Sequence, residues 1–223
     1  MEFLTFDQLP QGGFAGLIER QFVKDRRVFT PLANSPVSDG IGNFVYLADA
    51  NFLPNGETGM HGHREIDVIS VMVDGQIAHA GSMAHGQDLA AGEVQVQRAG
   101  GEGFQHNEVN PNNSQNQMIQ LWVLPEHPGK AADYKVYQPK SGELTQIYGN
   151  GSEPFDSQTQ IFVANTQSKQ NFSRSGPVMA YLSKGHGQIN GQPINARTLV
   201  RSEDGLTFSA NSDSQIIFIT TGG

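Results

Sequence analysis

The chain has 223 residues, of which 37% are hydrophobic, enough for one large all-β domain or two domains of about 100 residues each. It has no cysteine, which excludes disulfides and thiolate metal sites, and its formal net charge of −8 argues against direct nucleic-acid binding. No run approaches the roughly 20 apolar residues of a membrane helix, and no basic segment precedes an apolar one at the start, so we expect no membrane span, no signal peptide and a cytoplasmic location.

Short apolar or alternating runs, separated by turn sequences, fill the first half of the chain. Asn55-Gly56 and Asp74-Gly75 mark turns, and a glycine-rich corner lies at residues 99–103. The runs predict strands at residues 2–6, 16–23, 44–48, 66–73, 76–79, 94–97, 104–109 and 118–124. Strands this short, with turns at this spacing, are typical of a β-sandwich or β-barrel.

The segment 125–129, Pro-Glu-His-Pro-Gly, interrupts this pattern and predicts a boundary between an N-terminal domain, 1–129, and a C-terminal domain, 130–223. A helical turn is expected at residues 130–134. Further strands are predicted at residues 160–164, 178–182, 185–191, 199–200 and 215–220. Nowhere do ten or more residues keep a 3.6-residue apolar period, so the fold class is all-β. Gly-Gln-Ile at residues 75–77 recurs at 187–189, which indicates a duplicated barrel.

Two pairs of potential metal ligands, each with one residue between its members, stand in the first half. They are His61 with His63, and His106 with Glu108. In a strand, residues i and i+2 point to the same face, so two adjacent strands would offer three imidazoles and a carboxylate to one ion. Such ligands suit iron, nickel, copper, cobalt, manganese or zinc, and they leave one or two positions open on a six-coordinate ion. A closed structural zinc site is the alternative, but the mixed ligands favour a reactive centre.

The remaining histidines lack a paired partner, and we expect them on the surface or in turns; they are His79, His85, His127 and His186. Two acids follow the first pair. Glu65 is expected at the surface, whereas Asp67 is a metal ligand, an acceptor for an imidazole N–H or a solvent-facing acid. The second half has neither ligand pair, so it is not expected to hold the same ion. The chain contains no nucleophile elbow, phosphate-binding loop or dinucleotide fingerprint.

Three segments resemble the pirin family of the cupin superfamily. They are His-Gly-His-Arg at residues 61–64, Gly-Glu-Val-Gln at 92–95 and the run from Ala99 to Glu108. The resemblance implies a bicupin, in which two antiparallel β-barrels of the jelly-roll type stack on one another and the first alone holds a metal. Gly62 and Ala91 stand where the family usually has proline, and we expect these departures to leave the ion site intact. The residues at 65–67 also differ, which bears on substrate preference.

Members that resemble this chain are described as quercetin 2,3-dioxygenases. The resemblance therefore implies that His61, His63, His106 and Glu108 bind one divalent ion, with iron the first expectation and copper, nickel, cobalt, manganese or zinc the others. The implied catalytic residue is Glu108, which would accept the proton of a flavonol 3-hydroxyl before O₂ enters the reaction. The alternatives are a non-enzymatic, metal-dependent regulator that binds a transcription factor or a metabolic enzyme, and a different cupin reaction, such as an isomerase or another dioxygenase.

Overall fold

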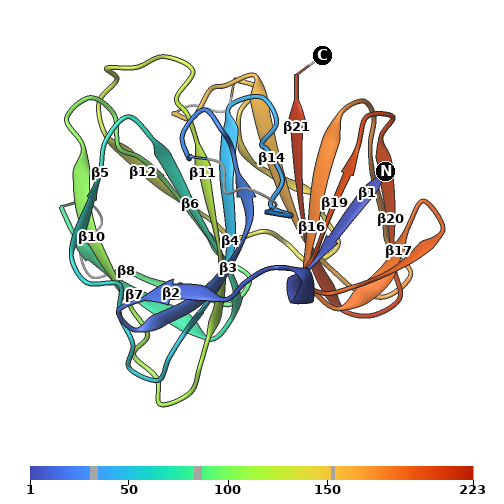
Figure 1. Ribbon diagram of the computed structural model, residues 1–223, viewed down its shortest axis with the longest axis horizontal. Coiled ribbons are helices and arrows are strands. Elements are labelled where there is room, and N and C mark those ends of the chain that lie inside the picture. The colour runs from blue at the N-terminus through green and yellow to red at the C-terminus, as the bar shows by residue number, and fades with distance from the viewer. Residues whose placement is uncertain (31–34, 83–86, 152–153, 223) are drawn as a thin grey trace.

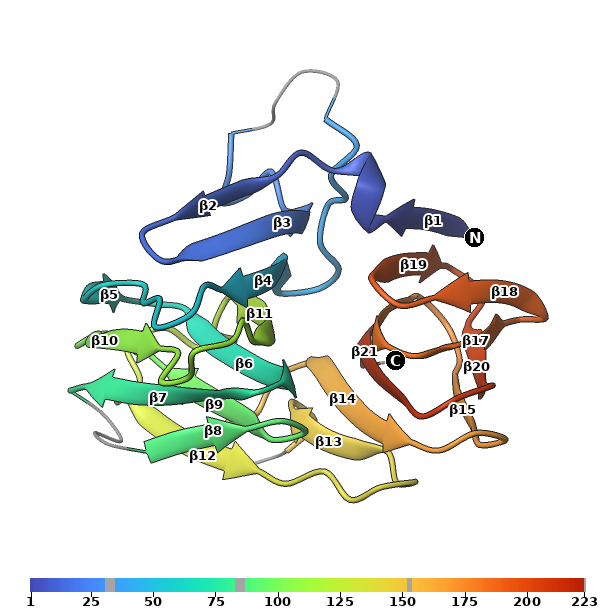
Figure 2. The ribbon, with the colours of Figure 1, turned by 90° about the horizontal axis from the view of Figure 1, so that it is seen from below.

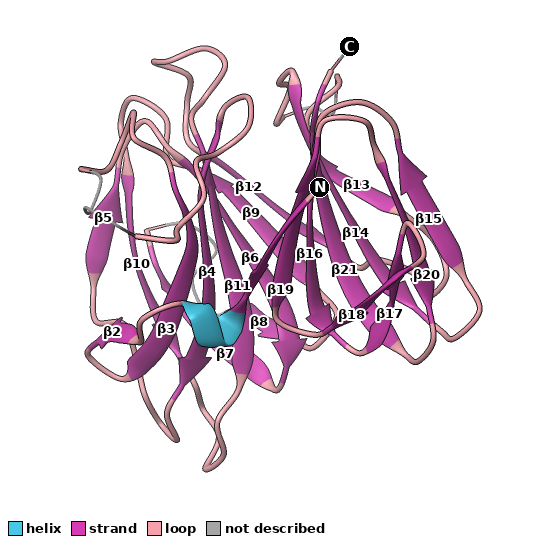
Figure 3. Ribbon diagram, turned by 45° about the vertical axis from the view of Figure 1, so that its right-hand side comes forward, coloured by secondary structure: helices cyan, strands magenta, loops and turns pink. Residues whose placement is uncertain are grey.

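The computed structural model describes residues 1–30, 35–82, 87–151 and 154–222, and in them the chain is all-β, as expected (Figures 1 and 3). A single turn of 3₁₀-helix, η1 at Phe6–Gln8, is the one helical element in these ranges. The helical turn predicted at 130–134 is wrong, because strand β12 begins there, at Asp133–Tyr137. None of the helical structure in these residues has the length or apolar character needed to cross a membrane.

The first half of the molecule is built from a seven-stranded and a four-stranded antiparallel sheet. The larger has the order β12-β9-β6-β11-β4-β3-β2, with β9 at Val94–Arg98, β6 at Asp67–Asp74, β11 at Gln117–Val123, β4 at Phe44–Phe52, β3 at Leu17–Lys24 and β2 at Gly12–Phe14. The smaller has the order β5-β10-β7-β8, with β5 at His61–His63, β10 at Phe104–Val109, β7 at Gln76–Gly81 and β8 at Gln87–Ala90.

The second half repeats this plan with a six-stranded and a four-stranded sheet. The larger has the order β1-β19-β16-β21-β14-β13, with β1 at Glu2–Thr5, β19 at Thr198–Ser202, β16 at Val178–Lys184, β21 at Ser214–Thr221, β14 at Thr159–Thr166 and β13 at Thr145–Tyr148. The smaller has the order β15-β20-β17-β18, with β15 at Asn171–Arg174, β20 at Leu206–Ala210, β17 at His186–Ile189 and β18 at Gln192–Asn195.

The two large sheets face each other (Figure 2). Their facing side chains form the main hydrophobic core. Val71 and Ile119 are paired across β6 and β11, and alternate residues on these strands share a face. Both belong to one buried cluster with Ile161 and Ile217 of the second half. This explains why β6 and β11 read as nearly continuous apolar runs, since one face packs on the other half and the opposite face lines the interior of their own half.

The two interiors differ in chemistry. Between the sheets of the second half lies a purely apolar cluster that includes Phe162, Leu182 and Phe208. In the first half, the corresponding face of the large sheet carries polar side chains, among them Ser70 and Gln120, which are opposite each other on β6 and β11. An interior lined by polar groups is suited to a ligand, whereas the second interior is filled by its own side chains.

Two strands join the halves. β1 pairs with β19 of the second half, and β12 pairs with β9 of the first. The division into domains 1–129 and 130–223 stays a prediction. β1 belongs to the first segment but is hydrogen-bonded to a sheet of the second, and β12 belongs to the second segment but is hydrogen-bonded to a sheet of the first.

Candidate metal centre

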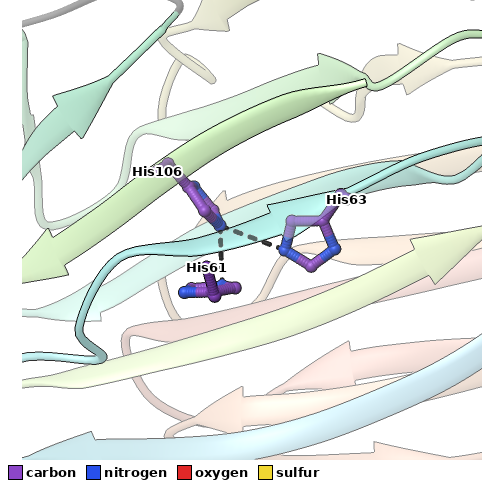
Figure 4. Close-up of side chains that lie close together, drawn as sticks. All are labelled: His61, His63 and His106. Atoms are coloured by element: carbon purple, nitrogen blue, oxygen red, sulfur yellow. Dashed lines mark hydrogen bonds between the residues drawn. The ribbon is translucent and has the colours of Figure 1, made fainter. Parts of the chain in front are cut away.

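The three paired histidines come together at the edge of the small sheet of the first half. β5 pairs with β10 in a register that places His61 opposite His106 and His63 opposite Phe104. Because His61 and His63 alternate with exposed Gly62, both imidazoles lie on the same face of β5 as expected, and they meet His106 there (Figure 4). One ligand atom from each ring lies within 4.8 Å of the others.

The nitrogen separations fit a shared ion. His106 Nε2 lies 2.9 Å from His61 Nε2 and 3.1 Å from His63 Nε2 (Figure 4). Two nitrogen ligands that each lie about 2.1 Å from one ion, at a right angle, are about 3.0 Å apart. The three rings therefore already have the spacing of neighbouring ligands.

Hydrogen bonds on the far side of two rings direct lone pairs toward this point. His61 Nδ1 donates to the carbonyl oxygen of Gly59 at 2.9 Å, so Nε2 of the neutral ring carries its lone pair. His106 Nδ1 lies 2.9 Å from His79 Nε2, which also receives the amide of Gln97 at 3.4 Å, so we assign His106 Nδ1 as the donor. Two lone pairs then face each other at Nε2, an arrangement that a bound cation stabilises.

Burial keeps the rings in the form that binds metals. Burial, together with the charges of neighbouring histidines, lowers the pKa of His63 to about 4 and that of His106 to about 2. Both imidazoles are therefore neutral at physiological pH, as a metal ligand must be.

Glu108 lies in the same pocket but outside the group of close ligand atoms. It shares a face of β10 with His106, and its Oε1 accepts a hydrogen bond from Ser70 Oγ at 3.0 Å. Complete burial raises the pKa of Glu108 to about 7, and the Ser70 hydroxyl opposes part of that shift. Its place as a fourth ligand stays a prediction.

His79 differs from the expectation of a surface or turn residue. It is 2% exposed on β7 and packs against His106, because β7 pairs with β10 on the side away from β5. A polar chain continues from it through Gln97 to Gln95, whose amide donates to Gln97 at 2.7 Å. A lone histidine in a strand gives no sequence signal for such a contact, which depends on strand order. His127 and His186 are exposed as expected, and His85 lies outside the described residues.

The two acids after the first pair turn away from the histidines. Glu65 is partly buried, and its carboxylate accepts the backbone N–H of Gly129 at 3.0 Å. Asp67 is 2% exposed, and its Oδ2 accepts the Tyr148 hydroxyl at 2.6 Å in the contact between the halves. Asp67 is therefore neither a solvent-facing acid nor an acceptor for an imidazole in this arrangement.

A small pocket, part of it open to solvent, lies beside the histidines. Its lining combines potential ligands with side chains from the inner face of the large sheet; they are Phe14, Leu17, Glu19, Tyr46, Ala50, Thr58, His61, His63, Glu108, Met118, Gln120 and Trp122. Sequence reasoning missed Glu19, Tyr46 and Trp122, which reach the pocket only because β3, β4 and β11 are neighbours. The arrangement offers an ion site with an adjoining aromatic and carboxylate-lined space.

Known proteins are similar to this chain in sequence and in fold. A family model described as Pirin matches residues 35–123. A quercetin 2,3-dioxygenase from Escherichia coli O157:H7 is 25% identical over 171 residues, which cover 71% of this chain and 74% of that protein. The solved structure of bacterial pirin YhhW in complex with nickel(II), from Escherichia coli, has a TM-score of 0.80 at 17% identity and covers 100% of this chain and 99% of that one. A quercetin 2,3-dioxygenase structure from Acinetobacter baumannii has a TM-score of 0.69 at 16% identity, and the match covers 100% of this chain and 86% of that one. The family model, the curated relatives and the shared fold agree, and over residues 35–123 the chain is similar to the pirin family.

Proposed function

We propose that this protein is a member of the pirin family and a metal-dependent dioxygenase of the quercetin 2,3-dioxygenase type. The observation that carries the proposal is the cluster of three imidazole nitrogens, at ligand spacing, beside a pocket lined by aromatic side chains. The names of several relatives support a flavonol as the substrate class. We further propose that the two halves are cupin barrels, divided near residue 129, of which the first alone is active.

In this proposal His61, His63, His106 and Glu108 hold one divalent ion, with iron the first candidate. The ion would supply Lewis acidity toward the flavonol oxygens and electronic coupling to O₂, for ring opening with release of CO. Glu108 accepts the proton of the flavonol 3-hydroxyl on a carboxylate oxygen, and Ser70 orients that carboxylate. The buried position of Glu108 keeps bulk water from competing for that proton.

The test of activity is quercetin turnover with O₂ uptake by protein loaded separately with iron, copper, nickel or manganese. We expect turnover with at least one of these metals and its loss in Glu108→Gln. Absence of turnover with every metal would contradict the dioxygenase assignment. If a protein partner also bound in a metal-dependent way, the result would favour the regulator.

The ion site itself is tested by elemental analysis. His61→Ala and Glu108→Ala should each lower bound metal, because each removes one of four ligands. His127→Ala, at an exposed position, is the matched control and should leave metal content unchanged. Unchanged metal in both site variants would overturn the ligand assignment.

A further inference from the structure

A buried carboxylate stands in the pocket wall apart from the proposed metal ligands. Glu19, on β3, is 8% exposed and lines the pocket. Its Oε1 accepts the Gln21 amide at 2.6 Å, and its Oε2 accepts the Tyr46 hydroxyl at 3.2 Å. These two contacts from strands β3 and β4 fix the carboxylate at the pocket surface.

This carboxylate retains capacity to accept hydrogen bonds. An ionised carboxylate has about four acceptor positions, and Gln21 and Tyr46 occupy two of them. The ion pairs formed among the described residues involve other acids, so no cation is paired with Glu19 there. A buried acceptor without a cation favours ligand groups that donate hydrogen bonds and disfavours ligand carboxylates.

An aromatic surface connects Glu19 to the histidines. Tyr46 and Trp122 are opposite each other on β4 and β11, and their rings stack with centroids 4.5 Å apart and planes at 29°. The Trp122 ring contacts the His63 ring edge-on, with their centroids 5.5 Å apart. The phenol that holds Glu19 and the indole that touches a proposed metal ligand therefore form one continuous stack of aromatic side chains, against which an aromatic ligand can pack.

We propose that Glu19 selects ligands that carry phenolic hydroxyl groups, accepting a hydrogen bond from a ring that lies along Tyr46 and Trp122. The ligand class rests on the proposed function, since a flavonol would place its 3-hydroxyl end at the ion. The selection itself is a binding property that does not require turnover. Glu19 is then the residue that separates polyhydroxylated flavonols from flavonols with bare rings.

The experiment compares the binding of quercetin with that of 3-hydroxyflavone, which lacks the hydroxyls on the outer rings. Titrations follow the emission of Trp122, the only tryptophan in the chain, with calorimetry as a second measurement. They are run without O₂, on metal-free and on zinc-loaded protein, because zinc fills the site without redox chemistry. We expect the wild type to prefer quercetin by about tenfold or more, the effect of a hydrogen bond to a charged acceptor.

Glu19→Gln keeps the shape of the side chain and removes its charge, and it should reduce that preference to within about twofold. Glu203→Gln, an exposed carboxylate in the second half, is the matched control and should retain the wild-type preference. A preference that persists in Glu19→Gln would overturn the proposal. The proposal would also be overturned if the wild type bound both ligands equally or bound neither. That outcome is measured on the wild type alone, so it does not depend on whether the variant folds. Failure of turnover alone, with the binding preference intact, would instead count against the dioxygenase assignment.

Discussion

The residue with the most direct influence on a proposed ligand, without being one, is His79. Its Nε2 lies 2.9 Å from His106 Nδ1 and thereby fixes which nitrogen of His106 carries the proton. We expect His79→Ala to weaken metal binding by about 10- to 100-fold, the usual effect of removing such a partner. His79→Gln should restore part of that loss, because its amide oxygen can accept from His106. Competition with a chelator measures both affinities, and exposed His186→Ala serves as the control. Equal affinities in wild type and His79→Ala would show that His106 needs no such support.

The sequence alone permits prediction of the three clustered histidines, because the spacing i, i+2 fixes a common face in any strand. It does not permit the same for His79 or Glu19. His79 reaches His106 through the pairing of β7 with β10, and Glu19 reaches the pocket through the pairing of β3 with β4. These contacts depend on strand order, which a local pattern does not encode.

At the scale of elements, the approach of β7 to β10 is set by a glycine. Gly81 is opposite His106, and a Cβ at position 81 would lie 2.3 Å from the carbonyl oxygen of Gln105 and 2.8 Å from His106 Cα. Gly81→Ala should therefore push the two strands apart, displace His106 and lower metal affinity. Gly62→Ala is the matched control within the site, since its Cβ would meet only atoms at 3.6 Å and beyond. Metal titrations of the two variants decide the point. An effect as large in Gly62→Ala as in Gly81→Ala would be inconsistent with this steric account.

Strand prediction succeeded for strands whose burial is nearly continuous, such as β6 and β16, but it missed β20, at Leu206–Ala210, in which alternate residues are buried. It also missed β15 and β18, which are short, polar and largely exposed. Such strands are held by hydrogen bonds to a neighbour, and they leave no periodic apolar signal in the sequence. β12 was mistaken for a helical turn for the same reason, since its residues are partly exposed along its whole length.

At the scale of the whole molecule, the sequence predicts the duplication. It predicts only part of the difference between the two halves. The missing ligand pairs in the second half were visible in the sequence. The replacement of a partly polar interior by a packed apolar one, which includes Phe208 and Phe218, required the strand registers. The outer faces of the two large sheets then supply the shared core, so the halves are expected to unfold together rather than one at a time.

That shared core contains buried acids whose ionisation should make stability depend on pH. Burial raises the pKa of Asp67 from 3.8 to about 6, although the Tyr148 hydroxyl and Arg98 oppose the shift. Because the folded pKa lies above the unfolded one, the carboxyl stabilises the fold below about pH 4, and that contribution is lost as pH rises to about 6. The loss amounts to about 3 kcal/mol for such a shift. Asp67→Asn removes the titration, so its free energy of unfolding, relative to wild type, should rise by about that amount between pH 4 and pH 7.

Urea unfolding of both proteins at several pH values measures this difference directly. Asp204→Asn, at an exposed position, provides the comparison, and its difference from wild type should stay nearly constant over the same range. A second buried acid in the same core, Asp49, accepts the Tyr181 hydroxyl at 2.6 Å, and burial raises its pKa to about 6 as well. The free energy of unfolding of Asp67→Asn should therefore still depend on pH, although less than that of wild type. Adding Asp49→Asn should remove a further part of this dependence. If the Asp67→Asn difference did not change with pH, Asp67 would have to be ionised in the folded protein at no cost, which its 2% exposure and single hydrogen-bonded oxygen contradict.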